Sequence, residues 1–196
     1  MLSHDHGFRD ASTGEFVSHS ALKDAATAAS YMLHHQYRLK PQETVAIVSR
    51  NALDYPIAVM AASRLGAVVT ALSPEAREED LVYFFQQSST VLVFADVDAW
   101  ERVHSAAKST SLDESRIIPI GEAGGRSLPT LQRLIGRAGS VQPVKAWKPS
   151  AKSNSICAFL AFTSGTTGRP KAVGGECPSA QLHLGFLPVL MTSLRS

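Results

Sequence analysis

The sequence has few cysteines, almost no net charge and no long hydrophobic run, and each shortage excludes a class of protein. Its two cysteines, Cys157 and Cys177, are too few for the disulfide framework of a small secreted protein, so we expect a cytoplasmic location. The formal net charge of +2 argues against a nucleic-acid-binding surface. No stretch reaches 18 apolar residues, and the most apolar part of the tail, Leu182 to Met191, is interrupted by Gly185 and Pro188, so we expect no membrane span.

Short apolar runs alternate with helical patterns along most of the 196 residues. The first helix is expected after a short hairpin, with Ser18 or Ser20 as its cap, and another is expected to open at Ser73-Pro74-Glu75. The segment 136–155 has little periodicity and is interpreted as a loop or linker. Strands are predicted near 44–49, 67–72, 91–95, 116–120 and 156–162. This alternation predicts an α/β fold, a mostly parallel β-sheet with flanking helices.

The segment directly after the last predicted strand combines glycines, hydroxyl groups and two cations. It is Thr-Ser-Gly-Thr-Thr-Gly-Arg-Pro-Lys over residues 163–171. Glycines let the backbone approach a ligand closely, and hydroxyls and cations suit a polyphosphate. The spacing is not that of the G-x-x-x-x-G-K-[ST] loop, because Lys171 comes three residues after the second glycine. The candidate phosphate-binding residues are Thr163, Ser164, Gly165, Thr166, Thr167, Gly168 and Lys171.

The same composition also fits an ordinary turn between two strands, but the string as a whole is more specific. Residue for residue, it resembles the phosphate-binding motif of the adenylate-forming (AMP-binding) superfamily, which includes acyl-CoA synthetases, 4-coumarate–CoA ligase-like enzymes, luciferases and adenylation domains of peptide synthetases. Upstream, Asp54-Tyr55-Pro56 and Ala67-Val68-Val69 resemble the acyl-CoA ligase branch more than the peptide-synthetase branch. The resemblance covers about residues 8–173.

The resemblance implies a reaction in two halves. A fatty or aromatic carboxylic acid attacks the α-phosphate of ATP with Mg²⁺, which gives an acyl adenylate and pyrophosphate, and coenzyme A then takes the acyl group as a thioester. In that scheme the segment 163–171 would hold the β- and γ-phosphates, with Lys171 offsetting their charge.

The resemblance stops after Val173. We therefore divide the chain into a partial AMP-binding domain over 1–173 and an unrelated tail over 174–196 that we expect to be disordered, as in a truncated protein. The family's magnesium-binding glutamate, ribose-binding aspartate and lid lysine have no counterpart in the sequence, so we predict no catalytic residue and no metal ligand here. The chain alone is expected to be inactive unless a C-terminal chain completes it.

Three other interpretations stay open. The chain could be a non-catalytic remnant that binds a nucleotide or a partner protein, a fragment of a peptide-synthetase-like adenylation domain, or a minimal phosphohydrolase. Relatives in this branch often end in the peroxisomal address Ser-Lys-Leu, whereas this sequence ends in Leu194-Arg195-Ser196. Because of the family branch, a peroxisomal location stays an alternative to the cytoplasmic one, although the sequence does not end in this address.

Overall fold

The computed structural model describes residues 6–11, 13–121, 130–138, 143–148, 156–163 and 170–176. A six-stranded sheet forms the centre of this part, with strand order β6-β5-β3-β4-β7-β8, and every neighbouring pair is parallel except β7 with β8. The sheet strands are β3 (Thr44–Val48), β4 (Val68–Leu72), β5 (Thr90–Ala95), β6 (Ile117–Pro119), β7 (Cys157–Thr163) and β8 (Lys171–Glu176). The predicted α/β fold with a mostly parallel sheet is confirmed, and the predicted strand limits agree to within one residue.

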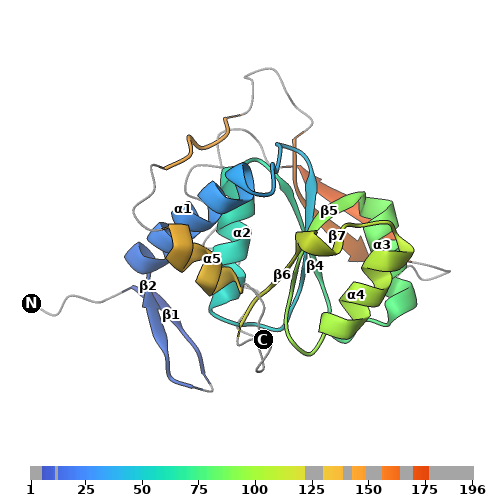
Figure 1. Cartoon of the computed structure of the whole chain (residues 1–196), viewed down its shortest axis with the longest axis horizontal. Helices are drawn as coiled ribbons and strands as arrows, with labels where there is room; N and C mark the ends of the chain where they lie inside the picture. Colours follow the sequence, from blue (N-terminus) through green and yellow to red (C-terminus); the bar gives the residue numbers. More distant parts are fainter. Residues whose placement is uncertain are drawn as a thin grey trace, which may run out of the picture.

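Helices cover both faces of the sheet (Figure 1). One face carries α1 (His19–His35), α2 (Asp54–Arg64) and α5 (Leu131–Ala138), and the other carries α3 (Glu78–Ser88) and α4 (Trp100–Ser109). Strand β3 lies between the two layers, so Val45 and Ile47 enter one core while Ala46 and Val48 enter the other. All five residues of β3 are buried, which explains why this strand is a continuous apolar run.

The chain begins with a small hairpin outside the main sheet. Strands β1 (Gly7–Arg9) and β2 (Phe16–Ser18) are antiparallel, and Gly14 between them has a φ of +76°. The Ser18 hydroxyl then accepts a hydrogen bond from the Ala21 backbone N–H at 3.1 Å, so Ser18 rather than Ser20 is the cap of α1. A one-turn 3₁₀ helix, η1 (Glu114–Arg116), leads into β6.

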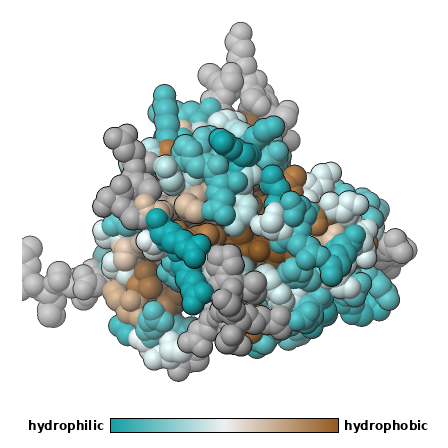
Figure 2. All heavy atoms as spheres, viewed as in Figure 1, coloured by the Kyte–Doolittle hydropathy of each residue, from teal (hydrophilic) through white to brown (hydrophobic). Residues whose placement is uncertain are grey.

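The surface view agrees with this layering. On the face shown in Figure 2, hydrophilic residues cover most of the described surface, and hydrophobic residues gather near its middle, where Figure 1 draws β6 between the helix layers. Among the described residues, no helix is both long and apolar enough to cross a bilayer.

The prediction for the start of α3 is wrong. Residues 73–76 form a turn instead of helix: the Ser73 hydroxyl accepts from the Glu75 N–H at 3.2 Å, and the Ser73 carbonyl accepts from the Ala76 N–H at 3.1 Å. The helix begins at Glu78, after an extended Arg77. Its first turn holds three acidic residues, which interact favourably with the partial positive charge of a helix N-terminus.

Two further limits differ from the prediction. The proposed linker over 136–155 begins inside α5, since residues 136–138 complete that helix, whereas residues 143–148 form neither helix nor strand. Strand β8 continues to Glu176, beyond Val173 where the family resemblance was expected to stop. The pairing with β7 extends that strand through Gly174 and Gly175.

Strand β7 is held at its start by the side chain of Gln42, which lies just before β3. The Gln42 amide oxygen accepts from the Cys157 N–H at 3.2 Å, and its Nε2 donates to the carbonyls of Cys157 at 3.3 Å and Gly66 at 3.1 Å. The side-chain amide thus makes hydrogen bonds to the Cys157 backbone like those that a neighbouring strand would make. It fixes β7 beside β4, to which β7 is joined by only a short parallel pairing, Val69 with Phe159 and Thr70 with Leu160.

The turn between α2 and β4 requires a glycine. Gly66 has a φ of +75°, and a Cβ at this position would overlap the indole ring of Trp147. Trp147 is held there because its backbone N–H donates to the Arg64 carbonyl at 2.9 Å. The segment 143–148 therefore packs over the end of α2 through a contact that no other residue type at position 66 permits.

We expect the substitution Gly66→Ala to lower the free energy of unfolding by at least about 1–2 kcal/mol, because alanine is strained in the left-handed region and also displaces Trp147. Gly136→Ala is the matched control, since Gly136 lies in α5 with open space around its Cα. In a helix this exchange should stabilise by up to about 1 kcal/mol. Chemical denaturation of the two variants checks this, and equal effects would contradict it.

We expect Gln42→Met to destabilise the chain by about 0.5–1.5 kcal/mol, since it removes the side-chain hydrogen bonds to Cys157 and Gly66 but keeps the side-chain length. The backbone N–H of residue 42 still donates to the Gly66 carbonyl at 2.7 Å. Hydrogen exchange should accelerate at the Cys157 amide more than at amides of β3. The same exchange at Gln87, which is exposed on α3, should change neither quantity. Unchanged exchange at Cys157 in Gln42→Met would show that β7 does not need this anchor.

Candidate functional site

The two ends of the candidate phosphate segment lie opposite each other in the β7–β8 hairpin. Thr163 is the last residue of β7 and Lys171 is the first of β8, and the two are paired in the antiparallel register. The Thr163 hydroxyl lies 3.5 Å from the Lys171 carbonyl oxygen, to which it donates. The five candidate residues between them, Ser164, Gly165, Thr166, Thr167 and Gly168, lie outside the described residues.

The hairpin places Thr163 and Lys171 at the carboxyl edge of the parallel strands. Strand β7 runs parallel to β4, so its last residue lies at the edge where β4 also ends. Ligands of open α/β sheets bind at this edge as a rule. The position of both residues in the fold is therefore compatible with the site predicted from the sequence.

Both side chains are accessible to a ligand. Thr163 and Lys171 are exposed, and no carboxylate in the described part of the chain lies within ion-pair distance of the Lys171 ammonium. An exposed ammonium group without an acidic partner is available to form charge-assisted hydrogen bonds with an anion that approaches. The arrangement can therefore attract phosphate oxygens, though in solvent the attraction is weakened by salt.

Helix α3 supports the hairpin from one face of the sheet. The Phe84 ring packs on the Phe162 ring of β7, with centroids 4.5 Å apart and planes tilted by 42°. The Tyr83 hydroxyl donates to the Pro170 carbonyl, just before β8, at 2.8 Å. Sequence reasoning missed both contacts. Nothing in the helical pattern of α3 indicates which strand its aromatic residues reach, because that depends on the tertiary arrangement.

The switch point of the sheet, a second place where a ligand could bind, is filled by the chain itself. Helix α2 follows β3 on one face and α4 follows β5 on the other, which leaves a crevice between the carboxyl ends of these strands. The Asp96 carboxylate occupies it and accepts from the N–H groups of Arg50 at 3.0 Å, Asp98 at 3.1 Å and Ala99 at 2.9 Å. The Arg50 guanidinium also pairs with the Asp98 carboxylate. These donors are therefore not available to an external anion.

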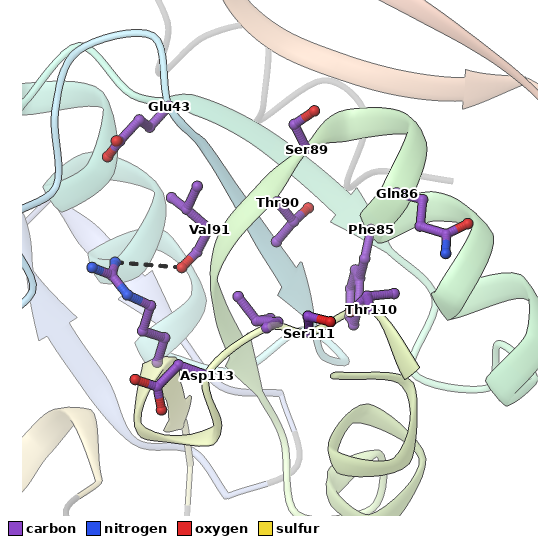
Figure 3. Close-up of a pocket in the computed structure, with 11 residues that line it drawn as sticks. Glu43, Phe85, Gln86, Ser89, Thr90, Val91, Thr110, Ser111 and Asp113 are labelled. Carbon is purple, nitrogen blue, oxygen red and sulfur yellow. Dashed lines mark hydrogen bonds between the residues drawn. The ribbon is translucent and has the colours of Figure 1, made fainter. Parts of the chain in front are cut away.

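An open cavity of about 560 Å³ lies at the opposite edge of the sheet, shown in Figure 3. It is formed where β3, β5 and β6 begin and where α3 and α4 end, by residues such as Glu43, Thr90 and Arg116. Hydrogen bonds from the backbone N–H and the hydroxyl of Ser115 lower the pKa of Asp113, which also lines the cavity. The cavity is separate from the β7–β8 hairpin, because the two lie at opposite ends of the parallel strands.

A family model described as "AMP-binding enzyme" matches residues 5–175. The sequence is 27% identical over 188 residues to 4-coumarate–CoA ligase-like 4 of Oryza sativa, which covers 95% of this chain and 33% of that protein. It is 30% identical over 158 residues to 4-hydroxybenzoate–CoA/benzoate–CoA ligase of Rhodopseudomonas palustris, and the match covers 80% of this chain and 28% of that protein. It is 25% identical over 169 residues to peroxisomal OPC-8:0-CoA ligase 1 of Arabidopsis thaliana, and the match covers 85% of this chain and 29% of that protein.

Solved structures resemble the fold. ATP-bound MatB from Rhodopseudomonas palustris superposes with a TM-score of 0.70 at 21% identity, over 90% of this chain and 33% of that one. The chain thus spans about a third of the length of the curated relatives it matches. The family match includes both strands of the β7–β8 hairpin except its last residue. With 171 consecutive residues inside the family model, the chain belongs to the family of AMP-binding enzymes.

Proposed function

We propose that this chain supplies the phosphate-binding, N-terminal part of an ATP-dependent acyl-CoA ligase. The observation that supports this most is the β7–β8 hairpin, which brings Thr163 and Lys171 together at the carboxyl edge of the sheet. No ion pair of Lys171 occurs among the described residues. The residues between Thr163 and Lys171 carry the glycines and hydroxyls of the candidate segment. In this proposal, Thr163, Ser164, Gly165, Thr166, Thr167, Gly168 and Lys171 hold the β- and γ-phosphates of ATP.

The substrate class follows from the relatives. Two of them are named for coumarate and benzoate, so we propose a fatty or aromatic carboxylic acid as the substrate of the whole enzyme. The carboxylate oxygen would form a bond to the α-phosphorus of ATP while the bond to pyrophosphate breaks. The thiol of coenzyme A would then displace AMP from the acyl carbon. Lys171 would offset the negative charge on the phosphate oxygens, and Mg²⁺ would share that role.

The isolated chain is proposed to bind phosphate without completing the reaction. It spans about a third of its relatives' length, and the sequence motifs for magnesium, ribose and the lid are not recognisable in it. A complementing chain with the remaining two thirds would then be needed for turnover. The alternative of a non-catalytic remnant differs in one outcome, because it would stay inactive even with that second chain.

For the location of the protein we propose the cytoplasm, on the small number of cysteines. The peroxisome is the alternative, because one relative carries that location in its name.

We expect the chain to bind inorganic pyrophosphate no more tightly than about 1 mM, or about −4 kcal/mol, because Thr163 and Lys171 are exposed to solvent. Lys171→Ala should weaken binding severalfold, and binding to the unsubstituted chain should weaken as salt is raised. Phosphorus NMR titration measures both. Lys23→Ala, which removes an exposed lysine from α1, is the control and should bind as the original chain does. Equal binding by all three proteins would contradict the proposed site.

We also expect no carboxylate-dependent exchange of pyrophosphate into ATP by the purified chain with benzoate, coumarate or a fatty acid. Exchange should appear when the missing two thirds of a relative is added as a separate chain, and it should be lost again with Lys171→Ala. Exchange by the chain alone, abolished by Lys171→Ala, would show that this part suffices for adenylation.

A further inference from the structure

The side chain of Tyr83 forms a hydrogen bond with the residue that precedes β8, although the two residues are far apart in the sequence. The Tyr83 hydroxyl of α3 donates to the Pro170 carbonyl at 2.8 Å, across 87 sequence positions. Both residues are partly buried, so this hydrogen bond is less exposed to competing water than one on the open surface. The hydrogen bond links α3 directly to the residue before β8.

This hydrogen bond acts on Lys171 through the geometry of the peptide group. The carbonyl of Pro170 and the N–H of Lys171 belong to one planar unit, so fixing the oxygen also fixes the plane from which Lys171 departs. The pyrrolidine ring restricts φ of Pro170. A hydroxyl bonded to this carbonyl therefore restricts the direction in which the Lys171 side chain leaves the backbone.

The neighbouring residue on the same helix fixes the other strand. The Phe84 ring packs on Phe162, next to Thr163, while Tyr83 bonds the residue before Lys171. Consecutive residues of α3 thus contact both strands of the hairpin near the end where β7 finishes and β8 begins. Thr163 and Lys171 are joined by a long hydrogen bond of 3.5 Å. The contacts from α3 stabilise this pair from outside the hairpin.

We propose that Tyr83 is a positioning residue for Lys171 in polyphosphate binding. The proposal rests on the proposed function, since it assigns Lys171 to the phosphates. Tyr83 itself does not touch the ligand in this proposal. It restricts the conformations of the Lys171 side chain before the anion binds, so the side chain loses less conformational entropy on binding.

A double-mutant cycle with inorganic pyrophosphate tests this. The dissociation constant is measured by phosphorus NMR for the original chain, Tyr83→Phe, Lys171→Ala and the double variant. Tyr83→Phe should weaken binding about 3- to 10-fold, the size expected for one hydrogen bond. In the Lys171→Ala background the same substitution should change binding less than about 2-fold. Tyr31→Phe, on α1 at the other face of the sheet, is the control and should have no effect.

Each outcome of the cycle has one meaning. If Lys171→Ala weakens binding and Tyr83→Phe does not, the positioning role is overturned and the proposed function stands. If Tyr83→Phe weakens binding equally with and without Lys171, Tyr83 does not act through the lysine and the proposal is overturned. If neither substitution changes binding, the proposed phosphate site fails and the positioning role fails with it.

Hydrogen exchange of the ligand-free chain gives a second measure that does not depend on binding. Tyr83→Phe should accelerate exchange at amides of β8 severalfold and leave β3 unchanged. Acceleration by the same factor throughout the sheet would mean that the hydroxyl serves global stability alone, and it would overturn the proposal even where the affinity has fallen.

Discussion

The pairing of β7 with its neighbours is the constraint on which the rest of the arrangement depends. Strand β7 contacts β4 in parallel and β8 in antiparallel orientation. Because side chains alternate between the faces of a strand, a slip of one residue would turn Phe162 away from Phe84 and move Thr163 out of line with Lys171. The Gln42 amide at one end and α3 at the other prevent such a slip.

The two edges of the sheet differ in what they offer to a ligand. At the carboxyl edge the crevice between β3 and β5 is closed by the Asp96 carboxylate, whereas Lys171 is open to solvent. At the amino edge the cavity beside Arg116 also contains Glu43 and Asp113, so its charge is mixed. An anionic ligand is therefore expected at the hairpin and not in the larger cavity.

The strands and the layer order could be predicted from the sequence, because continuous apolar runs and helical periodicity reflect burial directly. Strand β8 could not, since Gly174 and Gly175 have little preference for extended structure and the strand forms by pairing with β7. Ser73-Pro74 gave a false helix start, because its hydroxyl capped a turn instead.

The ends of the candidate site were also predictable, as Thr163 and Lys171 belong to a specific motif. The support from Tyr83 was not, because no local pattern tells which distant carbonyl a tyrosine on α3 will meet. Local signals thus suggested the candidate residues of the site, and the tertiary structure was needed to find the hydrogen bond between Tyr83 and Pro170.

The central claim is that polyphosphate binds at the β7–β8 hairpin, and chemical-shift mapping tests it most directly. Pyrophosphate is added to the nitrogen-labelled chain, and the amide shifts are followed at both edges of the sheet. The account predicts changes at Thr163, Lys171 and the start of β8, with none around Thr110 and Arg116. Shifts confined to the cavity beside Arg116, with the hairpin unchanged, would contradict it.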